Sequence, residues 1–387
     1  MKILYISYTG FADTDFPLIR ALQNKGVDIT YVLDVAPSTK KGTIINIEHL
    51  YPCNKLIHVN EYPELNLFKS YLKFDKFYIL NRTKDRRLSF SRQIDELKFL
   101  AFIKKEKFDI VHTTHILWYF ELLIFLFHSK TVLTVHDPFP HSGETYLRKS
   151  LFRWTSFKLS SKFVLLNNKQ SDNFCKVYNI SKNRLLVSRI SVFDYLDVFR
   201  NVAPSPSANN ILFYGRISPY KGIDYLCEAM IKVHQKLPNV TLTIAGSGKI
   251  YFDWTKYEKL PYIKLINKYL DMTDIVALLD SCAVVVCPYT DATQSGVVTT
   301  AFSMKKPVIA TKVGGLDEMV IDGITGFLVK PKDVDNLSET IINAMSNPHN
   351  LDNIKNHIEE IYFHGNNSWP LISEEYLKLY NSLLRKS

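Results

Sequence analysis

Short apolar runs alternate with longer amphipathic segments along most of this chain. Within each run successive positions are apolar, as in strands that helices cover on both faces. The longer segments carry apolar residues at helical spacing, for example over 15–25. This alternation is typical of parallel βαβ units and predicts an α/β fold. The runs before residue 200 lie at 2–7, 28–34, 109–114, 130–137 and 162–168.

The alternation is interrupted once, at 201–210, where the sequence NVAPSPSANN has the composition of a linker. We therefore predict an N-terminal domain over 1–200 and a second α/β domain over 211–365. A chain of 387 residues is long enough for two cores of this size. The closing segment, 366–387, has helical periodicity. The runs of the second domain lie at 210–215, 240–248, 262–267, 283–289, 306–311 and 326–330.

The composition narrows the classes of partner. The chain carries 48 basic and 38 acidic residues, a formal net charge of +10, which favours nucleic acid, a phosphorylated ligand or an anionic membrane. The five cysteines have no metal-ligand spacing and are odd in number, so we expect a reducing cytoplasm and no disulfide framework. The most apolar stretch, 116–127, contains Glu121 and is well short of the roughly 20 residues of a spanning helix. The N-terminus has the pattern of a first strand, not of a secretory signal.

Two cations follow the first run of the second domain. The segment GRISPYKG at 215–222 places Arg216 and Lys221 on a glycine-bearing loop between a strand and a helix. In open α/β sheets, ligands bind beyond the carboxyl ends of the strands. Arg216 can form paired hydrogen bonds with phosphate oxygens, and Lys221 adds a point charge beside a helix N-terminus. The pattern indicates a diphosphate site, with a solvated turn as the alternative.

Two further turns have the same setting. TQSGV at 293–297 follows an apolar run and precedes a helical segment. The backbone N–H groups of Ser295, Gly296 and Val297 are therefore expected to form an anion-binding nest. VGG at 313–315 follows the next run in the same way. Three such turns at neighbouring strand ends are a much stronger signal than one, and they indicate a phosphorylated ligand.

Five segments of the second half carry most of this pattern, namely GRISPYKG (215–222), IAGSG (244–248), DIVALLDSCAVVVCPY (274–289), SGVVTTAFSMKKPVIAT (295–311) and VGGLDEMVIDGITGFLV (313–329). In this order they resemble the family 4 (group 1) retaining glycosyltransferases of the GT-B type. The resemblance implies two Rossmann-like domains facing across a cleft, with a C-terminal helix that crosses back to the N-terminal domain. It implies a nucleoside-diphosphate sugar as donor, with Arg216 and Lys221 on the diphosphate, and transfer with retained anomeric configuration. It implies no metal ion or other cofactor, and the sequence has no Asp-x-Asp pair where a metal ion would bridge the diphosphate.

One part of the family pattern is absent. Many members carry two glutamates around the helix before KPVIAT, and this sequence has Ala292 and Thr300 at the aligned positions. It reads TQSGVVTTAFS instead and resembles a sub-group with Gln-Ser-Gly-Val at this turn. Gln294, Thr300 and Glu318 are the candidates for contacts with the donor ribose or sugar. Two alternatives to a transferase stay open: a nucleotide-sugar epimerase of the same two-domain type, and a binding protein without catalytic activity.

The N-terminal half matches the family more loosely. His136 lies at the end of the run at 130–137, where a group that contacts the transferred sugar belongs, and the resemblance makes it the candidate catalytic residue. A structural histidine bonded to a carbonyl is the alternative. His115 and Asp137 are candidates for contacts with the acceptor. Gly10 would let the backbone approach the donor phosphates.

Two stretches, 68–92 and 146–162, combine basic and aromatic residues. They predict docking on an anionic membrane, although a nucleic-acid face or an ordinary solvated surface has a similar composition. No RNA-binding fingerprint accompanies them, so we do not expect nucleic acid. The sequence thus predicts a glycosyltransferase of surface polysaccharide or lipopolysaccharide biosynthesis that acts on a glycan or a lipid-linked sugar. We expect it in the cytoplasm, in peripheral contact with the inner face of the cytoplasmic membrane.

Overall fold

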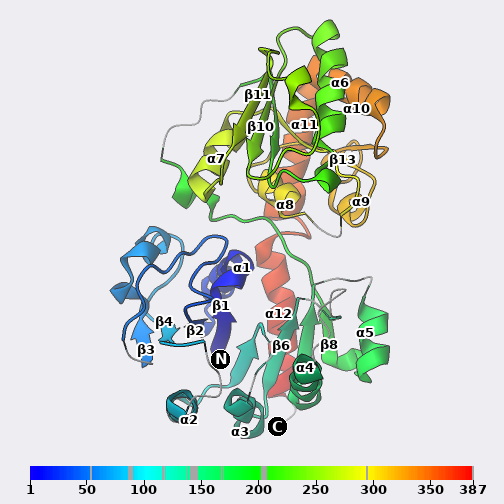
Figure 1. Ribbon diagram of the computed structural model, residues 1–387. Coiled ribbons are helices and arrows are strands. Elements are labelled where there is room, and N and C mark those ends of the chain that lie inside the picture. Colours follow the sequence, from blue (N-terminus) through cyan, green and yellow to red (C-terminus); the bar gives the residue numbers. More distant parts are fainter. Residues whose placement is uncertain are drawn as a thin grey trace. The chain divides into compact units, whose positions relative to one another are not determined.

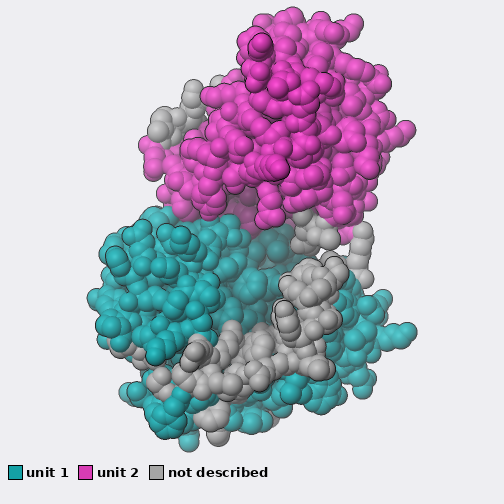
Figure 2. Space-filling view, in the orientation of Figure 1, with its two compact units in different colours: residues 1–190, 369–387 teal, residues 191–368 magenta. Residues whose placement is uncertain are grey.

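The chain divides into two compact units. The computed structural model describes residues 1–52, 55–85, 90–115, 117, 119–136, 138–139, 147–166, 168, 170–201, 207–292 and 295–385. Unit 1 comprises Met1–Ile190 and Trp369–Ser387, and unit 2 comprises Ser191–Ser368 (Figure 2). Each unit is built on its own sheet, which confirms the predicted α/β fold with two Rossmann-like domains.

Unit 1 is built on an eight-stranded sheet in the order β3-β4-β2-β1-β5-β6-β7-β8. Its strand pairs are parallel except β3 and β4, which run antiparallel at one edge. The inner strands are buried at nearly every position because helices cover both faces. The strands are β1 (Lys2–Tyr8), β2 (Asp28–Val35), β3 (Lys55–His58), β4 (Phe77–Asn81), β5 (Ile110–Thr113), β6 (Thr131–Val135), β7 (Lys162–Leu165) and β8 (Leu185–Val187).

The direction of each crossover decides which face a helix covers. The step from β1 to β2 runs toward one edge of the sheet, and the steps from β4 to β5, β6 and β7 run toward the other. Because such crossovers are right-handed, α1 covers one face, and α2, α3 and α4 cover the opposite face (Figure 1). The C-terminal helix α12 packs beside α1. The helices of unit 1 are α1 (Ala12–Asn24), α2 (Phe90–Glu106), α3 (Leu123–Phe127), α4 (Leu147–Leu159), α5 (Ser171–Tyr178) and α12 (Trp369–Leu384).

Unit 2 is built on a six-stranded parallel sheet in the order β11-β10-β9-β12-β13-β14. The chain leaves β9 toward one edge and later returns to add β12 on its other side. This is the doubly wound arrangement, and ligands bind such sheets where the strand order reverses, here between β9 and β12. The strands are β9 (Asn210–Tyr214), β10 (Thr241–Gly246), β11 (Ile263–Asn267), β12 (Val284–Cys287), β13 (Val308–Thr311) and β14 (Gly326–Val329). The helices are α6 (Ile223–Lys236), α7 (Met272–Asp280), α8 (Gly296–Ser303), α9 (Leu316–Met319), α10 (Val334–Ser346) and α11 (Pro348–Glu359).

The boundary between the units falls earlier in the sequence than the linker expected at 201–210. Residues 191–200 were assigned to the N-terminal domain, but they pack in unit 2. Val192 belongs to the apolar core of unit 2, and the Arg200 guanidinium bonds both oxygens of the Asp280 carboxylate at 2.9 and 3.0 Å. The proline-rich composition that suggested the linker therefore lies after the segment that changes units.

The basic stretch at 68–92 is not a continuous surface. It contains β4, and it also contains Arg82 and Arg92, which are 1% and 5% exposed. Both guanidinium groups contact the Asp34 carboxylate at the end of β2. Arg residues are buried in this way when carboxylates neutralise them. No helix in the described part of the chain is long and apolar enough to cross a membrane.

Candidate functional site

The loop after β9 is fixed closely against the loop after β12. Gly222 has φ +64°, and a Cβ at this position would lie 2.0 Å from the Pro288 carbonyl oxygen. A side chain there is excluded, so the two loops approach at backbone distance. The Thr290 N–H donates to the Tyr220 carbonyl at 2.8 Å and joins the same loops. The segment 215–222 therefore presents its side chains from a rigid position.

Lys221 is held over an aromatic ring. Its ammonium lies 3.6 Å from the centroid of the Tyr289 ring and 5.0 Å from that of Tyr220. Only 9% of the residue is exposed, and burial lowers the pKa of Lys221 to about 8. An aromatic face attracts a cation without neutralising its charge, so the charge of Lys221 stays available to a bound anion. Arg216 begins the same loop and is exposed.

The first turn of α8 lies beside this loop. A Cβ at Gly215 would lie 3.7 Å from the Val297 side chain, and the Tyr214 hydroxyl donates to the Val297 carbonyl at 3.0 Å. Ser295 precedes Gly296, the first helical residue, and Ser295 is buried. The first N–H groups of a helix have no partner within it and carry partial positive charge. Two cations and a helix N-terminus thus converge at the strand reversal between β9 and β12.

The candidates for ribose or sugar contacts are less favourably arranged. The Thr300 hydroxyl donates to the Gly296 carbonyl at 2.7 Å within α8, so its proton is used inside the helix. Glu318 is an exposed residue of α9, which follows β13. Gln294 lies outside the described residues.

Tyr289 is the residue of this site that the sequence analysis missed. It is 1% exposed, its ring lies under Lys221, and its hydroxyl is 3.4 Å from the Ser295 hydroxyl. It thus links the cation to the start of α8. The apolar run at 283–289 includes Tyr289 in the expected strand, and only its position after Pro288 indicates a loop residue.

Unit 1 presents two stacked pairs at the carboxyl ends of β1, β5 and β6. The His115 ring stacks on Tyr8 with centroids 3.9 Å apart, and the His136 ring stacks on Phe11 at the same distance. Gly10 is exposed in the turn between Tyr8 and Phe11. The turn after β1 therefore orients both histidines. Asp137 lies outside the described residues.

His136 is a neutral imidazole. Burial lowers its pKa to about 4, and among the described residues its Nε2 has no hydrogen-bond partner. The alternative for His136 is a structural histidine bonded to a nearby carbonyl. Among the described residues, no carbonyl forms such a bond with its Nε2. His112, one strand away, differs because its two nitrogens contact the Tyr380 and Thr134 hydroxyls at 2.7 and 2.8 Å. His112 is therefore a structural residue.

The described residues contain no group of three or more His, Cys, Asp or Glu side chains that could hold a metal ion. The loops of unit 2 present cations and N–H groups, which suit an anion. The turns of unit 1 present neutral aromatic and imidazole rings, which suit the stacking and hydroxyl contacts of a sugar.

Two family models match the chain. Residues 208–347 match the model described as Glycosyl transferases group 1, and residues 17–188 match Glycosyltransferase Family 4. Two uncharacterized glycosyltransferases of Methanocaldococcus jannaschii are 30% and 25% identical over 35% and 57% of this chain. The matched segments span 38% and 60% of these relatives. A GDP-mannose:glycolipid 4-beta-D-mannosyltransferase of Xanthomonas campestris pv. campestris is 24% identical over 47% of this chain and 50% of its own.

Solved structures share the fold along the whole chain. A glycosyltransferase from Rickettsia africae ESF-5 has a TM-score of 0.64 at 18% identity and covers 100% of this chain and 99% of its own. HepE from Anabaena, solved in complex with UDP, has a TM-score of 0.61 at 17% identity, with 99% and 100% covered. The UDP-GlcNAc 2-epimerase from Neisseria meningitidis bound to UDP-GlcNAc has a TM-score of 0.63 at 15% identity, with 100% of both chains covered. The two family models match consecutive parts of the chain, and the strand reversal of unit 2 gathers cations. The chain therefore belongs to the group 1, family 4 glycosyltransferases of GT-B fold.

Proposed function

We propose that this protein is a hexosyltransferase that moves a sugar from a nucleoside-diphosphate sugar to a hydroxyl of a glycan or lipid-linked acceptor. The observation that carries the proposal is the set of positive groups between β9 and β12: Arg216, Lys221 and the first N–H groups of α8. They match the charge of a diphosphate. The Anabaena neighbour solved with UDP and the glycolipid mannosyltransferase among the relatives support the two substrate classes.

The chemistry follows from where negative charge grows. When the bond between the sugar and the diphosphate breaks, the leaving nucleoside diphosphate gains charge at the oxygen that the sugar leaves. Fixed cations and helix N–H groups stabilise that charge without reorganising. No metal ion is needed for this role, and we propose that the enzyme works without one. Family membership supports retention of the anomeric configuration.

Unit 1 supplies the acceptor side of the proposal. A neutral His136 can accept a hydrogen bond from a sugar hydroxyl through Nε2, which has no partner among the described residues, whereas a protonated imidazole could only donate. His136 is thus proposed to position the transferred sugar, and the His115 and Tyr8 pair to contact the acceptor. Gly10 and Asp137 keep their proposed contacts with phosphate and acceptor, and Gln294 and Glu318 keep theirs with the donor ribose or sugar.

The proposal also covers the location of the enzyme and the pathway in which it acts. A positively charged enzyme that receives a lipid-linked sugar belongs at the inner face of the cytoplasmic membrane, in surface polysaccharide or lipopolysaccharide synthesis. The glycolipid named in the Xanthomonas relative supports an acceptor of this class.

A binding screen tests the donor site. Calorimetry with UDP, GDP, ADP and CMP identifies the nucleotide, and Arg216→Ala is expected to weaken the preferred one roughly tenfold to a hundredfold, since charged hydrogen bonds contribute about 1.5–3 kcal/mol. Lys236→Ala, at the far end of α6 from this loop, is the matched control. Equal affinity of Arg216→Ala and the parent protein would remove the donor site from this loop.

Product analysis then separates transfer from the alternatives. The parent protein is incubated with the matching nucleotide-sugar, with and without a lipid extract. A glycosylated lipid with the donor's anomeric configuration supports the proposal. An epimerised nucleotide-sugar without any acceptor identifies an epimerase, and donor binding with neither product identifies an inactive binding protein.

A further inference from the structure

Exposed apolar side chains gather on one face of unit 1. Thirteen large apolar side chains in the described part of the chain are exposed, and six of them lie on α2, α3 and α4. These helices cover the same face of the sheet and pack side by side (Figure 1). Their exposed fractions run from 39% for Ile94 to 82% for Phe90. We name this set the three-helix face: Phe90, Ile94, Leu97, Leu126, Leu151 and Trp154.

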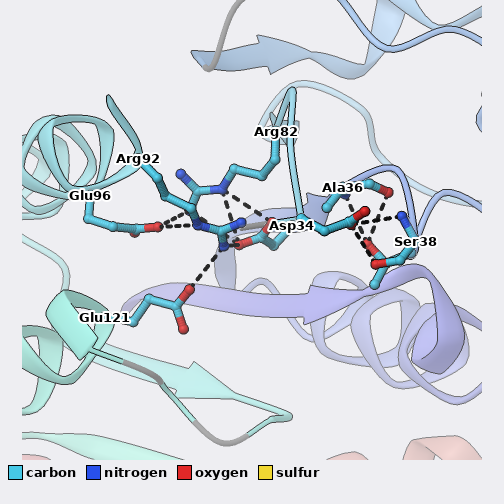
Figure 3. A network of polar contacts seen from close by, with 9 residues as sticks. Asp34, Ala36, Ser38, Arg82, Arg92, Glu96 and Glu121 are labelled. Atoms are coloured by element: carbon cyan, nitrogen blue, oxygen red, sulfur yellow. Dashed lines mark hydrogen bonds and ion pairs between the residues drawn. The ribbon is translucent and has the colours of Figure 1, made fainter. Parts of the chain in front are cut away.

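The first half of helix α2 has the inverse of the usual amphipathic pattern, whereas the second half buries Phe99 and Ile103 in the apolar core. Arg92 and Glu96 point toward the sheet, where Figure 3 shows them with Arg82, Asp34 and Glu121. The Glu96 carboxylate lies 2.6 Å from the Arg82 guanidinium, and Arg92 lies 3.2 Å from the Glu121 carboxylate. Ion pairs therefore hold the buried side of the first half of α2 against the sheet.

The opposite side of this first half is apolar. With 3.6 residues per turn, Phe90, Ile94 and Leu97 lie on the side of the helix away from Arg92 and Glu96, and all three are exposed. A helix in water normally places its charges outside and its apolar residues inside. The reversal in α2 indicates that its outer side faces something other than water.

Helix α4 adds a second apolar stripe with a positive border. Leu151 and Trp154 point outward, whereas Arg153 is buried and donates to the Pro138 carbonyl at 3.2 Å. The Lys158 ammonium lies 5.6 Å from the Trp154 ring. The sequence of α4 contains no acidic residue. Its outer side is thus apolar and basic.

The exposed charged residues in the described part of α2 are lysines. Lys104 and Lys105 are exposed in the last turn of α2. The acids of this helix are compensated, since Glu96 is buried with arginines, Asp95 lies 3.4 Å from Lys98, and Glu106 lies 2.7 Å from Lys2. A partner with negative charge around an apolar interior matches this arrangement.

We propose that the three-helix face docks on an anionic lipid bilayer, with its apolar side chains in the headgroup and acyl boundary and its lysines at the lipid phosphates. A bilayer receives side chains that protrude from three separate helices without needing a complementary shape. A second copy of the chain on the same face would bring the lysines of both copies together. The inference rests on the proposed function only for its purpose, which is to bring unit 1 to a lipid-linked acceptor.

Vesicle co-sedimentation tests the proposal on the full chain. The parent protein is expected to bind vesicles of phosphatidylcholine mixed with phosphatidylglycerol and to bind phosphatidylcholine alone much more weakly. The double variant Leu151→Ser with Trp154→Ser is expected to lower the partition constant at least about tenfold. Lys104→Glu with Lys105→Glu is expected to lower it only on the anionic vesicles, by about fivefold or more per lysine. Tyr269→Ser, which removes a 79% exposed ring from unit 2, is the matched control.

The outcomes separate this inference from the proposed function. Nucleotide binding, measured on the same samples, is expected to be unchanged in all of these variants. Lack of vesicle binding by a parent protein that binds nucleotide overturns the membrane surface and leaves the donor site standing. Equal vesicle binding of the parent and the α4 double variant also overturns it. A parent dimer that becomes a monomer in the α4 variant, measured by light scattering, assigns the face to a second copy and overturns it as well.

Discussion

The buried position of Lys221 gives nucleotide binding a pH dependence that an exposed lysine would not cause. With a pKa of about 8, about nine in ten Lys221 ammonium groups are charged at pH 7, and about one in ten at pH 9. The terminal phosphate of a nucleoside diphosphate, with a pKa near 6, is already about nine-tenths ionised at pH 7, so its charge changes little between pH 7 and pH 9. Burial raises the pKa of the neighbouring Cys287 to about 11 and holds the pKa of Tyr289 well above its usual value, so neither is ionised there. Lys221 is the titrating group that the bound phosphate would contact.

The magnitude follows from the fraction that is charged. If the bound anion requires the ammonium form, the dissociation constant rises with the neutral fraction, by about tenfold between pH 7 and pH 9. Calorimetric titration with the preferred nucleotide at several pH values measures it. Lys221→Arg is expected to remove most of the slope, because a guanidinium stays charged. Lys221→Met is expected to bind weakly at every pH. A parent protein with flat affinity from pH 7 to pH 9, or a Lys221→Arg variant with the parent slope, would refute the reasoning.

Three other perturbations probe the same account. Tyr289→Leu is expected to weaken nucleotide binding about twofold to thirtyfold in calorimetry, whereas Tyr289→Phe, which keeps the ring under Lys221, is expected to stay within about twofold of the parent protein. Gly222→Ala is expected to lower the free energy of unfolding in urea by roughly 2–4 kcal/mol, and Gly26→Ala, with a similar φ but open space around its Cβ, by about 1 kcal/mol. Equal costs for the two glycines would contradict the close loop contact. The His136 ring is expected to keep the nitrogen chemical shifts of a neutral imidazole at pH 5.5, since its pKa is lowered to about 4, and shifts of an imidazolium at that pH would refute its burial.

The sequence predicted the interior of both sheets well because buried parallel strands leave a simple pattern. The runs that became β9 and β12 are buried throughout and apolar at every position except Asn210. The strands that it missed lie at or near an edge of the sheet. β3 begins with the exposed Lys55, and the apolar run of β8 is only three residues long, so neither stands out in the sequence. β4 is buried but sits within a basic stretch that we interpreted as surface.

Burial of charge was the main property that the sequence could not reveal. Arg82 and Arg92 contribute to a basic composition, yet the carboxylates that neutralise them come from distant segments, with Asp34 on β2 and Glu121 before α3. Composition therefore assigned to the surface two side chains that anchor α2. The inverted orientation of the first half of α2, and with it the exposure of Phe90, follows from that long-range pairing.

The candidate site was predictable as far as backbone turns define it. The glycines and cations of 215–222 and the turn at 295–297 are local patterns, and the structure brings both to the same strand reversal. The ring under the Lys221 ammonium belongs to Tyr289, and no local sequence pattern predicts this tertiary contact. The Thr300 hydroxyl was a ribose candidate by alignment, but its hydrogen bond within α8 depends on the helix geometry.

Hydrogen exchange with and without saturating nucleotide tests the central claim most directly, because it reports which backbone segments a ligand covers. We expect the preferred nucleoside diphosphate to slow exchange in peptides covering 215–222 and 295–299, at the strand reversal between β9 and β12. Peptides from the far end of α6, around Lys236, are expected to exchange as before. Protection that appears elsewhere in the chain while both loops exchange unchanged would contradict the assignment of this edge as the donor site.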